Sequence, residues 1–143
     1  MGISIRTEAG LAIVTIDNPP VNALSQRVRA ALVQAVADLD ADDEVRAVVL
    51  AGAGRLFVGG ADIAEFDLPP QEPHLPDLLH GIETARKPWI AALRGAALGG
   101  GLEIALACAF RVATPDTRLA LPEVNLGIIP GAGGTQRLPR LIG

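Results

Sequence analysis

The sequence is short of the residues on which several common kinds of enzyme chemistry depend. Its 143 residues include one lysine, Lys87, two serines, Ser4 and Ser25, and no tyrosine. A phosphate-binding P-loop needs a lysine directly after a glycine-rich run, and the nucleophile elbow of α/β-hydrolases needs a serine between glycines. Neither pattern occurs. The sequence therefore excludes a P-loop nucleotide hydrolase and a hydrolase built on that elbow.

The chain is also short of positive charge and of long apolar runs. Its formal net charge is −4 and it has no basic tract, which argues against nucleic acid as a partner. The longest apolar stretch, between Arg94 and Arg111, is interrupted by Glu103, so no membrane span is expected. Residues 1–6 lack the apolar core of a signal peptide. We expect a cytoplasmic protein.

Cysteine and histidine are too scarce to indicate a metal or redox site. The single cysteine, Cys108, lies in an apolar run that we expect to be helical, where it would serve as a small buried hydrophobe and form no internal disulfide. His74 and His80 have no metal-ligand spacing, and the acidic residues at 40–44 are predicted to form a solvated loop. Glycines at 131 and 133 match only part of a dinucleotide-binding fingerprint, since Gln136 occupies its third position. No metal is expected.

What the chain does contain is an alternation of strand and helix patterns without a repeat or a linker, which predicts one α/β domain over residues 1–143. A β-hairpin is expected first. The strand after the first helix is expected to pair in parallel, because a helix precedes it. A proline-rich loop is expected over 66–76 and is predicted to be mobile. Strands are predicted at 3–7, 11–16, 45–50, 87–93, 111–113 and 118–121, and helices at 25–39, with Ser25 as the N-cap, at 77–85, from 100 to about 110, and from about 137 onward.

One stretch combines three glycines with a carboxylate in otherwise apolar surroundings. Gly99, Gly100 and Gly101 open a predicted helix whose first turn carries Glu103, and this helix has no polar face. Bare N–H groups at a helix start favour negative charge, and a buried carboxylate needs a partner or a use. Glu123 also has apolar neighbours. Both acids could be ordinary helix-end and loop residues, or they could divide the work of general acid and base.

Four motifs then make the chain resemble the enoyl-CoA hydratase (crotonase) family, in the family's order and spacing, over about residues 11–143. The motifs are F-V-G-G-A-D-I at 57–63, A-L-G-G-G-L-E at 97–103, L-P-E-V at 121–124 and G-I-I-P-G-A-G-G-T-Q-R at 127–137. The resemblance implies a crotonase-like superhelix of repeated β-β-α units. It also implies an acyl-CoA thioester as substrate, with coenzyme A as part of the substrate and no separate cofactor, and a homo-oligomer, a trimer or dimer of trimers.

The resemblance assigns roles to particular positions. The backbone N–H groups of Ala61 and Gly100 would form an oxyanion hole, and Glu103 and Glu123 would be the catalytic pair, with Glu103 as base toward water and Glu123 as proton donor. Because both glutamates are present, hydration of a 2-enoyl-CoA in fatty-acid β-oxidation is the expected reaction. Isomerisation of an enoyl-CoA, or acyl-CoA binding without turnover, are the alternatives. Substrate-binding positions would be Ala23, Leu24, Gly60, Ala61, Asp62, Ile63 and Gly99.

The sequence departs from the family in two respects. Many relatives carry a basic residue just before Asn-Ala-Leu, where this chain has Pro20-Val21, so no phosphate contact is predicted on that side. The pattern over residues 18–25 is more similar to the hydratase part of multifunctional β-oxidation enzymes, which continue into a 3-hydroxyacyl-CoA dehydrogenase. A full crotonase domain is also about twice as long as this chain. We therefore expect the N-terminal part of such a domain, without the C-terminal helices that cover the site.

Overall fold

The computed structural model describes residues 2–143, and its centre is a five-stranded sheet in the order β1-β2-β3-β4-β6. The first two strands form the expected antiparallel hairpin, and each later neighbour runs parallel to the one before. A separate parallel pair, β5 and β7, lies beyond the sheet. The strands are β1 Gly2–Glu8, β2 Leu11–Asp17, β3 Ala47–Gly52, β4 Trp89–Leu93, β5 Ala96–Leu98, β6 Phe110–Ala113 and β7 Arg118–Ala120.

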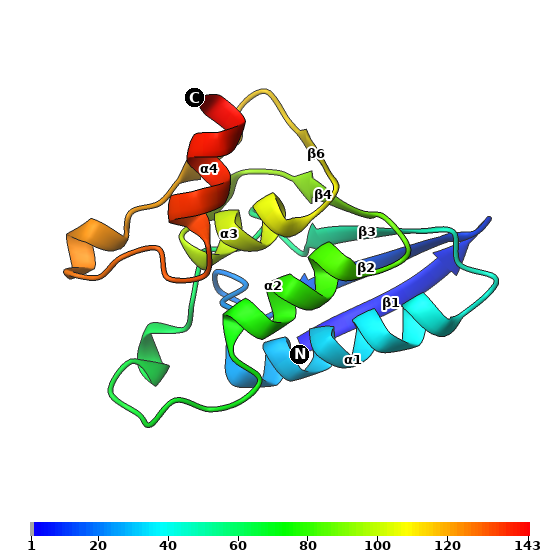
Figure 1. Cartoon of the computed structure of the whole chain (residues 1–143), viewed down its shortest axis with the longest axis horizontal. Coiled ribbons are helices and arrows are strands. Elements are labelled where there is room, and N and C mark those ends of the chain that lie inside the picture. Colours follow the sequence, from blue (N-terminus) through cyan, green and yellow to red (C-terminus); the bar gives the residue numbers. More distant parts are fainter. Residues whose placement is uncertain (1) are drawn as a thin grey trace.

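Helices connect the parallel strands, as parallel pairing requires. Figure 1 shows α1, α2 and α3 following one another across one face of the sheet, with α4 beyond α3 at the C-terminal end. Two short 3₁₀ turns, η1 and η2, lie in the loops at the edge of the fold. The helical segments are α1 Gln26–Ala41, η1 Ile63–Glu65, α2 Leu75–Thr84, α3 Gly100–Ala107, η2 Glu123–Leu126 and α4 Gly134–Ile142. This arrangement confirms the predicted α/β class.

The core lies between the sheet and its helices and is built mainly from aliphatic side chains. Alternate residues of β2, namely Ala12, Val14 and Ile16, are fully buried, because side chains on a strand point to opposite faces in turn. Val28 and Leu32 of α1 are buried against the same core. None of the helices within residues 2–143 is long and apolar enough to cross a membrane.

Several predicted boundaries were wrong. Helix α2 begins at Leu75 rather than residue 77, because Pro76 fits the first turn of a helix and His74 and Asp77 form a capping box before it. Helix α3 ends at Ala107, so Cys108 is buried at the helix C-cap and not in mid-helix. The guanidinium of Arg111 donates to the Ala105 and Cys108 carbonyls and thereby satisfies that helix end.

Candidate active site

The three glycines allow α3 to start in close contact with the segment 58–61. Gly99 has a φ of 53°, a backbone conformation that residues with a side chain rarely adopt. It turns the chain from β5 into the helix. A Cβ on Gly101 would overlap the Val58 carbonyl oxygen. A Cβ on Gly100 would lie 3.5 Å from the Ala61 nitrogen. The glycines therefore place the start of α3 directly against Ala61.

Two backbone N–H groups, those of Ala61 and Gly100, meet at this contact. Gly100 is the first residue of α3, so no helical carbonyl is available to its N–H. Neither N–H donates to a protein acceptor among the hydrogen bonds outside the regular elements of residues 2–143. Both residues line one cavity. The site therefore presents two adjacent donors to a ligand, at the positive end of a helix.

Glu103 is held at this cavity by the loop before α4. The residue is 3% exposed, and its Oε1 accepts hydrogen bonds from the N–H groups of Ala132 and Gly134, each at 2.9 Å. Burial raises the pKa of Glu103, the two N–H donors oppose that rise, and the nearby charge of Glu123 adds to it. The carboxylate is thus fixed through one oxygen, while no described residue donates to the other.

Glu123 approaches the same cavity from η2. Its side chain is buried, and its Oε2 accepts no hydrogen bond from any residue in 2–143. Its Oε1 would lie only 3.0 Å from a Cβ on Gly99. A buried carboxylate oxygen without a donor is costly unless it carries a proton or contacts a ligand or water. Glu123 is therefore placed to contact a ligand or water in the cavity.

The cavity itself has a volume of about 300 Å³ and collects all four groups: Ala61, Gly100, Glu103 and Glu123. Apolar side chains form much of the remaining wall: Ile63, Phe66, Leu75, Leu126, Ile128 and Ile129. A second cavity of about 420 Å³, lined by the proline-rich loop, shares Ala61, Phe66, Leu75 and Ile128 with it. The arrangement combines two acids with two backbone donors in a largely apolar pocket.

Comparison with known proteins identifies the family. The family model described as enoyl-CoA hydratase/isomerase matches residues 6–143. The chain belongs to the enoyl-CoA hydratase/isomerase family. It is 47% identical, over 99% of its length and 57% of the relative's, to the probable enoyl-CoA hydratase of Bacillus subtilis (strain 168). It is 54% identical to the peroxisomal bifunctional enzyme of Danio rerio over 93% of this chain and 18% of that protein.

A solved structure confirms the crotonase-like fold that the sequence predicts. The enoyl-CoA hydratase of Bacillus anthracis superposes with a TM-score of 0.93 at 37% identity, covering all of this chain and 59% of that one. The chain thus spans somewhat more than half the length of the hydratases it matches, and about a fifth of the bifunctional relative. The relation to the N-terminal part of multifunctional β-oxidation enzymes, expected from residues 18–25, is confirmed.

The positions that the family resemblance marked as substrate-binding do not all reach the cavity. Gly60, Ala61, Ile63 and Gly99 line it, whereas Asp62 lines the neighbouring cavity and caps η1 through the Ala64 N–H at 3.1 Å. Ala23 and Leu24 line neither. Leu24 is buried beneath the site, and its N–H donates to the Gly60 carbonyl at 2.9 Å. In this structure Leu24 therefore supports the enoyl-CoA hydratase/isomerase site through its backbone bond to Gly60 and does not line the cavity.

Sequence reasoning missed two polar residues that organise this family site. Asn22 is 4% exposed and donates through Nδ2 to the carbonyls of Ala53, Leu56 and Phe57. Arg29 is buried on α1, next to Val28 on the apolar side of that helix. A charged residue on the apolar stripe of a predicted helix was the signal available for Arg29. For Asn22 the signal was the tolerance of asparagine for a positive φ, here 52°.

Proposed function

We propose that this chain carries an enoyl-CoA hydratase site, which adds water across the C2=C3 bond of a 2-enoyl-CoA thioester in fatty-acid β-oxidation. The observation that supports the proposal is the meeting of two buried carboxylates, Glu103 and Glu123, with two unused N–H groups in one cavity. The carboxylates come from α3 and η2, and the donors from α3 and the segment before η1. The matched relatives named enoyl-CoA hydratase support it independently.

The two N–H groups would act on the thioester oxygen. When water adds at C3, the electron pair of the C2=C3 bond moves toward the thioester and places enolate charge on that oxygen. Ala61 and Gly100 are fixed donors that can accept this charge without reorganising, and losing one such donor typically costs about 3 kcal/mol of transition-state stabilisation. The positive end of α3 favours the same charge.

The two carboxylates would handle the protons. Glu103, as base, takes one proton from water while the water oxygen bonds to C3, and Glu123, as proton donor, delivers a proton to C2. Oε1 of Glu103 is occupied by the loop, so Oε2 is the oxygen left for water. Because burial raises the pKa of Glu103, its ionised form is a stronger base than an exposed glutamate. Water addition is redox-neutral, so we propose no cofactor besides the coenzyme A of the substrate.

The full-length protein, as its gene encodes it, should be tested with crotonyl-CoA. Turnover is followed as loss of the conjugated-thioester absorbance. We expect turnover, and a fall in kcat of roughly 100- to 10,000-fold in Glu123→Gln. Glu44→Gln, in an exposed loop, is the matched control and should retain full activity. Lack of turnover by the unaltered protein, or full turnover by Glu123→Gln, would overturn the proposal.

Two further outcomes correspond to other functions. Formation of a 2-enoyl-CoA from a 3-enoyl-CoA, without hydration, would select isomerisation by the same two acids. Calorimetric binding of crotonyl-CoA without any reaction would select a binding module. We also propose a homo-oligomer, a trimer or dimer of trimers, which light scattering of the full-length product would test. A cytoplasmic location is proposed too, and imaging of the tagged protein would separate it from the peroxisome named for several relatives.

A further inference from the structure

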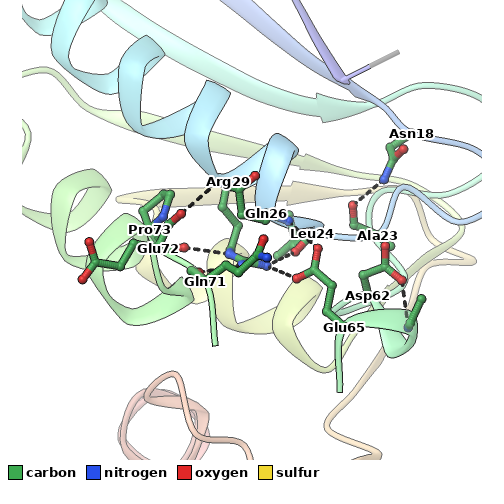
Figure 2. A network of polar contacts seen from close by, with 11 residues as sticks. Asn18, Ala23, Leu24, Gln26, Arg29, Asp62, Glu65, Gln71, Glu72 and Pro73 are labelled. Carbon is green, nitrogen blue, oxygen red and sulfur yellow. Dashed lines mark hydrogen bonds and ion pairs between the residues drawn. The ribbon is translucent and has the colours of Figure 1, made fainter. Parts of the chain in front are cut away.

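We propose that Arg29 is a positioning residue that holds the Ala61 N–H in its working place by bracing the chain on both sides of it. The inference rests on the proposed function, because it gives Ala61 a role as donor to the thioester oxygen. Arg29 belongs to α1, outside all four motifs that point to the site. Figure 2 shows the contacts of Arg29 as one connected network.

Arg29 uses all three nitrogens of its guanidinium. Nε donates to the Pro73 carbonyl at 2.8 Å, and Nη2 to the Gln71 carbonyl at 3.1 Å. Nη1 donates to the Leu24 carbonyl at 2.8 Å and to Oε2 of Glu65 at 2.9 Å. The Arg29 side chain is only 10% exposed. A buried guanidinium with this many acceptors is an organising centre, since each bond fixes a different segment.

The first brace lies before Ala61 in the chain. The Leu24 carbonyl accepts from Arg29, while the Leu24 N–H donates to the Gly60 carbonyl at 2.9 Å. Leu24 and Ala61 form an isolated parallel bridge. The peptide that carries the Ala61 N–H therefore pairs with a residue whose own carbonyl is fixed by Arg29.

The second brace lies after Ala61. Glu65 ends η1, which starts two residues beyond Ala61, and its Oε2 pairs with Arg29. Its Oε1 accepts the Gln26 N–H at 2.6 Å, at the start of α1. Ser25 occupies the predicted N-cap position, but its side chain makes no capping bond, so Glu65 supplies it. Through Glu65, η1 is thus held against the N-terminal end of α1. Leu24 lies just before that same end.

The proline-rich loop depends on the same residue. The carbonyls of Gln71 and Pro73 accept from Arg29, and that of Glu72 accepts from Gln26 Nε2 at 2.9 Å. Prolines have no N–H to offer, so a loop with four of them over 66–76 has few donors of its own. Arg29 and Gln26 supply what the loop lacks. The loop that lines both cavities is therefore tied to α1 through three of its carbonyls.

The acceptors of the Arg29 N–H groups indicate that this residue positions the chain and does not contact the substrate. Arg29 lines the neighbouring cavity but not the one that contains Glu103 and Glu123. Each of its three nitrogens already has a protein acceptor. Lysine could not replace it, because one ammonium cannot reach acceptors spread across a planar fork. We therefore expect loss of Arg29 to change kcat rather than KM.

The experiment compares Arg29→Met, Arg29→Lys and Glu65→Gln with Asp40→Asn in the natural full-length product. Asp40 lies near the other end of α1, where it accepts from Arg86 and Lys87, and serves as the control. One readout is kcat and KM with crotonyl-CoA. The other is the red shift of bound 4-dimethylaminocinnamoyl-CoA, a chromophore whose absorbance moves to longer wavelength when its thioester carbonyl accepts hydrogen bonds.

We expect Arg29→Met and Arg29→Lys to lower kcat by about 10- to 100-fold, because small misplacements of a catalytic group have effects of that size. Glu65→Gln should lower kcat by a smaller factor. In all three variants KM should change little, and the red shift of the bound chromophore should decrease together with kcat. Asp40→Asn should change neither. If Arg29→Met fails to fold, Glu65→Gln decides, since it keeps the guanidinium and its bonds to the carbonyls of Leu24, Gln71 and Pro73.

Three results would overturn the inference. One is an unchanged kcat and red shift in variants that only unfold more easily, which would make Arg29 purely structural. Another is a raised KM with an unchanged kcat, which would make it a substrate contact. The third is no red shift in the unaltered protein, which would remove the donor role of Ala61 as well. A normal red shift without hydration would reject only the proposed function, and the variants' red shifts would still judge Arg29.

Discussion

Arg137 and Glu83 form a two-bond ion pair that joins α4 to α2, with Nε to Oε1 at 3.0 Å and Nη2 to Oε2 at 2.8 Å. The third nitrogen of Arg137, Nη1, donates to the Ala132 carbonyl at 3.0 Å. Ala132 is one of the two residues whose N–H groups hold Glu103. The pair therefore fixes the loop that fixes the proposed base.

Replacing Arg137 with methionine should move the acid limb of the kcat/KM profile to higher pH. The positive charge of Arg137 lowers the pKa of Glu103, so its removal leaves that pKa further raised. A base that is protonated at higher pH loses activity at higher pH. The measurement is the pH profile of crotonyl-CoA hydration. Glu83→Gln keeps the Arg137 charge and should move the limb less.

The control for Arg137→Met is Arg140→Met on the same helix. Arg140 is exposed, and among residues 2–143 its side chain bonds only within α4, to the carbonyl and side chain of Gln136. Its removal takes away the same formal charge without touching the loop that holds Glu103. An equal displacement of the acid limb in both variants would show a general charge effect and contradict the role given to Arg137.

Glu103→Gln should stabilise the fold at neutral pH while abolishing activity. Burial raises the pKa of Glu103 above the ordinary value of 4.5, so the folded state holds this proton more tightly than the unfolded chain. The ionised carboxylate therefore destabilises the fold fully above the folded-state pKa, and that cost fades as pH falls toward 4.5. The glutamine side chain of the variant can still accept from the N–H groups of Ala132 and Gly134.

The measurement is the free energy of unfolding of Glu103→Gln and the unaltered protein, across a series of pH values. The advantage of the variant should be largest at neutral pH and should disappear near pH 4.5. Glu44→Gln, which removes a carboxylate from an exposed loop, should show no such pH-dependent gain. A difference that is constant with pH would contradict the assigned origin of the raised pKa.

The parts of this site that the sequence predicts are those whose geometry is local. The glycines and Glu103 lie within five residues, and the helix start dictates how they face one another. Bringing Ala61 and Glu123 to them needed the family resemblance, because no periodicity relates segments that far apart. Arg29 and Asn22 escaped because most of their partners are backbone carbonyls, which any residue provides and no sequence pattern marks. The end of α3, where Arg111 donates to the carbonyls of Ala105 and Cys108, escaped for the same reason.

Asn22→Ala should destabilise the fold by about 2–3 kcal/mol, because it leaves buried carbonyls without their donor. Nδ2 of Asn22 serves Ala53 at 2.9 Å and Leu56 at 3.1 Å, and Oδ1 accepts the Asn18 N–H at 3.0 Å. Alanine also tolerates the φ of 52° poorly. Chemical denaturation measures the loss, with Asn125→Ala, at an exposed position, as control.

Asn22→Gly separates the two causes. Glycine adopts a positive φ freely but supplies no side-chain bonds, so it should still lose most of the stability if the carbonyls matter. Recovery of nearly full stability in Asn22→Gly would instead assign the effect of Asn22→Ala to backbone strain.

The glycines at 101 and 81 predict opposite responses to the same substitution. Both lie within helices, α3 and α2, where alanine is intrinsically favoured over glycine by about 0.5–1 kcal/mol. At Gly81 a Cβ would meet only Val36 Cγ1 at 3.8 Å, an ordinary contact, so Gly81→Ala should raise stability by about that amount. At Gly101 the Cβ would overlap the carbonyl oxygen of Val58, which cannot rotate away as a side chain could.

Gly101→Ala should therefore push α3 from the segment 58–61 and destabilise the fold by about 1–3 kcal/mol, despite the better helix former. Because the Gly100 and Ala61 donors meet across this contact, the red shift of bound 4-dimethylaminocinnamoyl-CoA should also shrink in whatever fraction remains folded. Thermal unfolding of the two alanine variants measures the stability difference. Equal gains in both would mean that α3 does not need to approach Val58 so closely, and the pairing of the two donors would then have no steric basis.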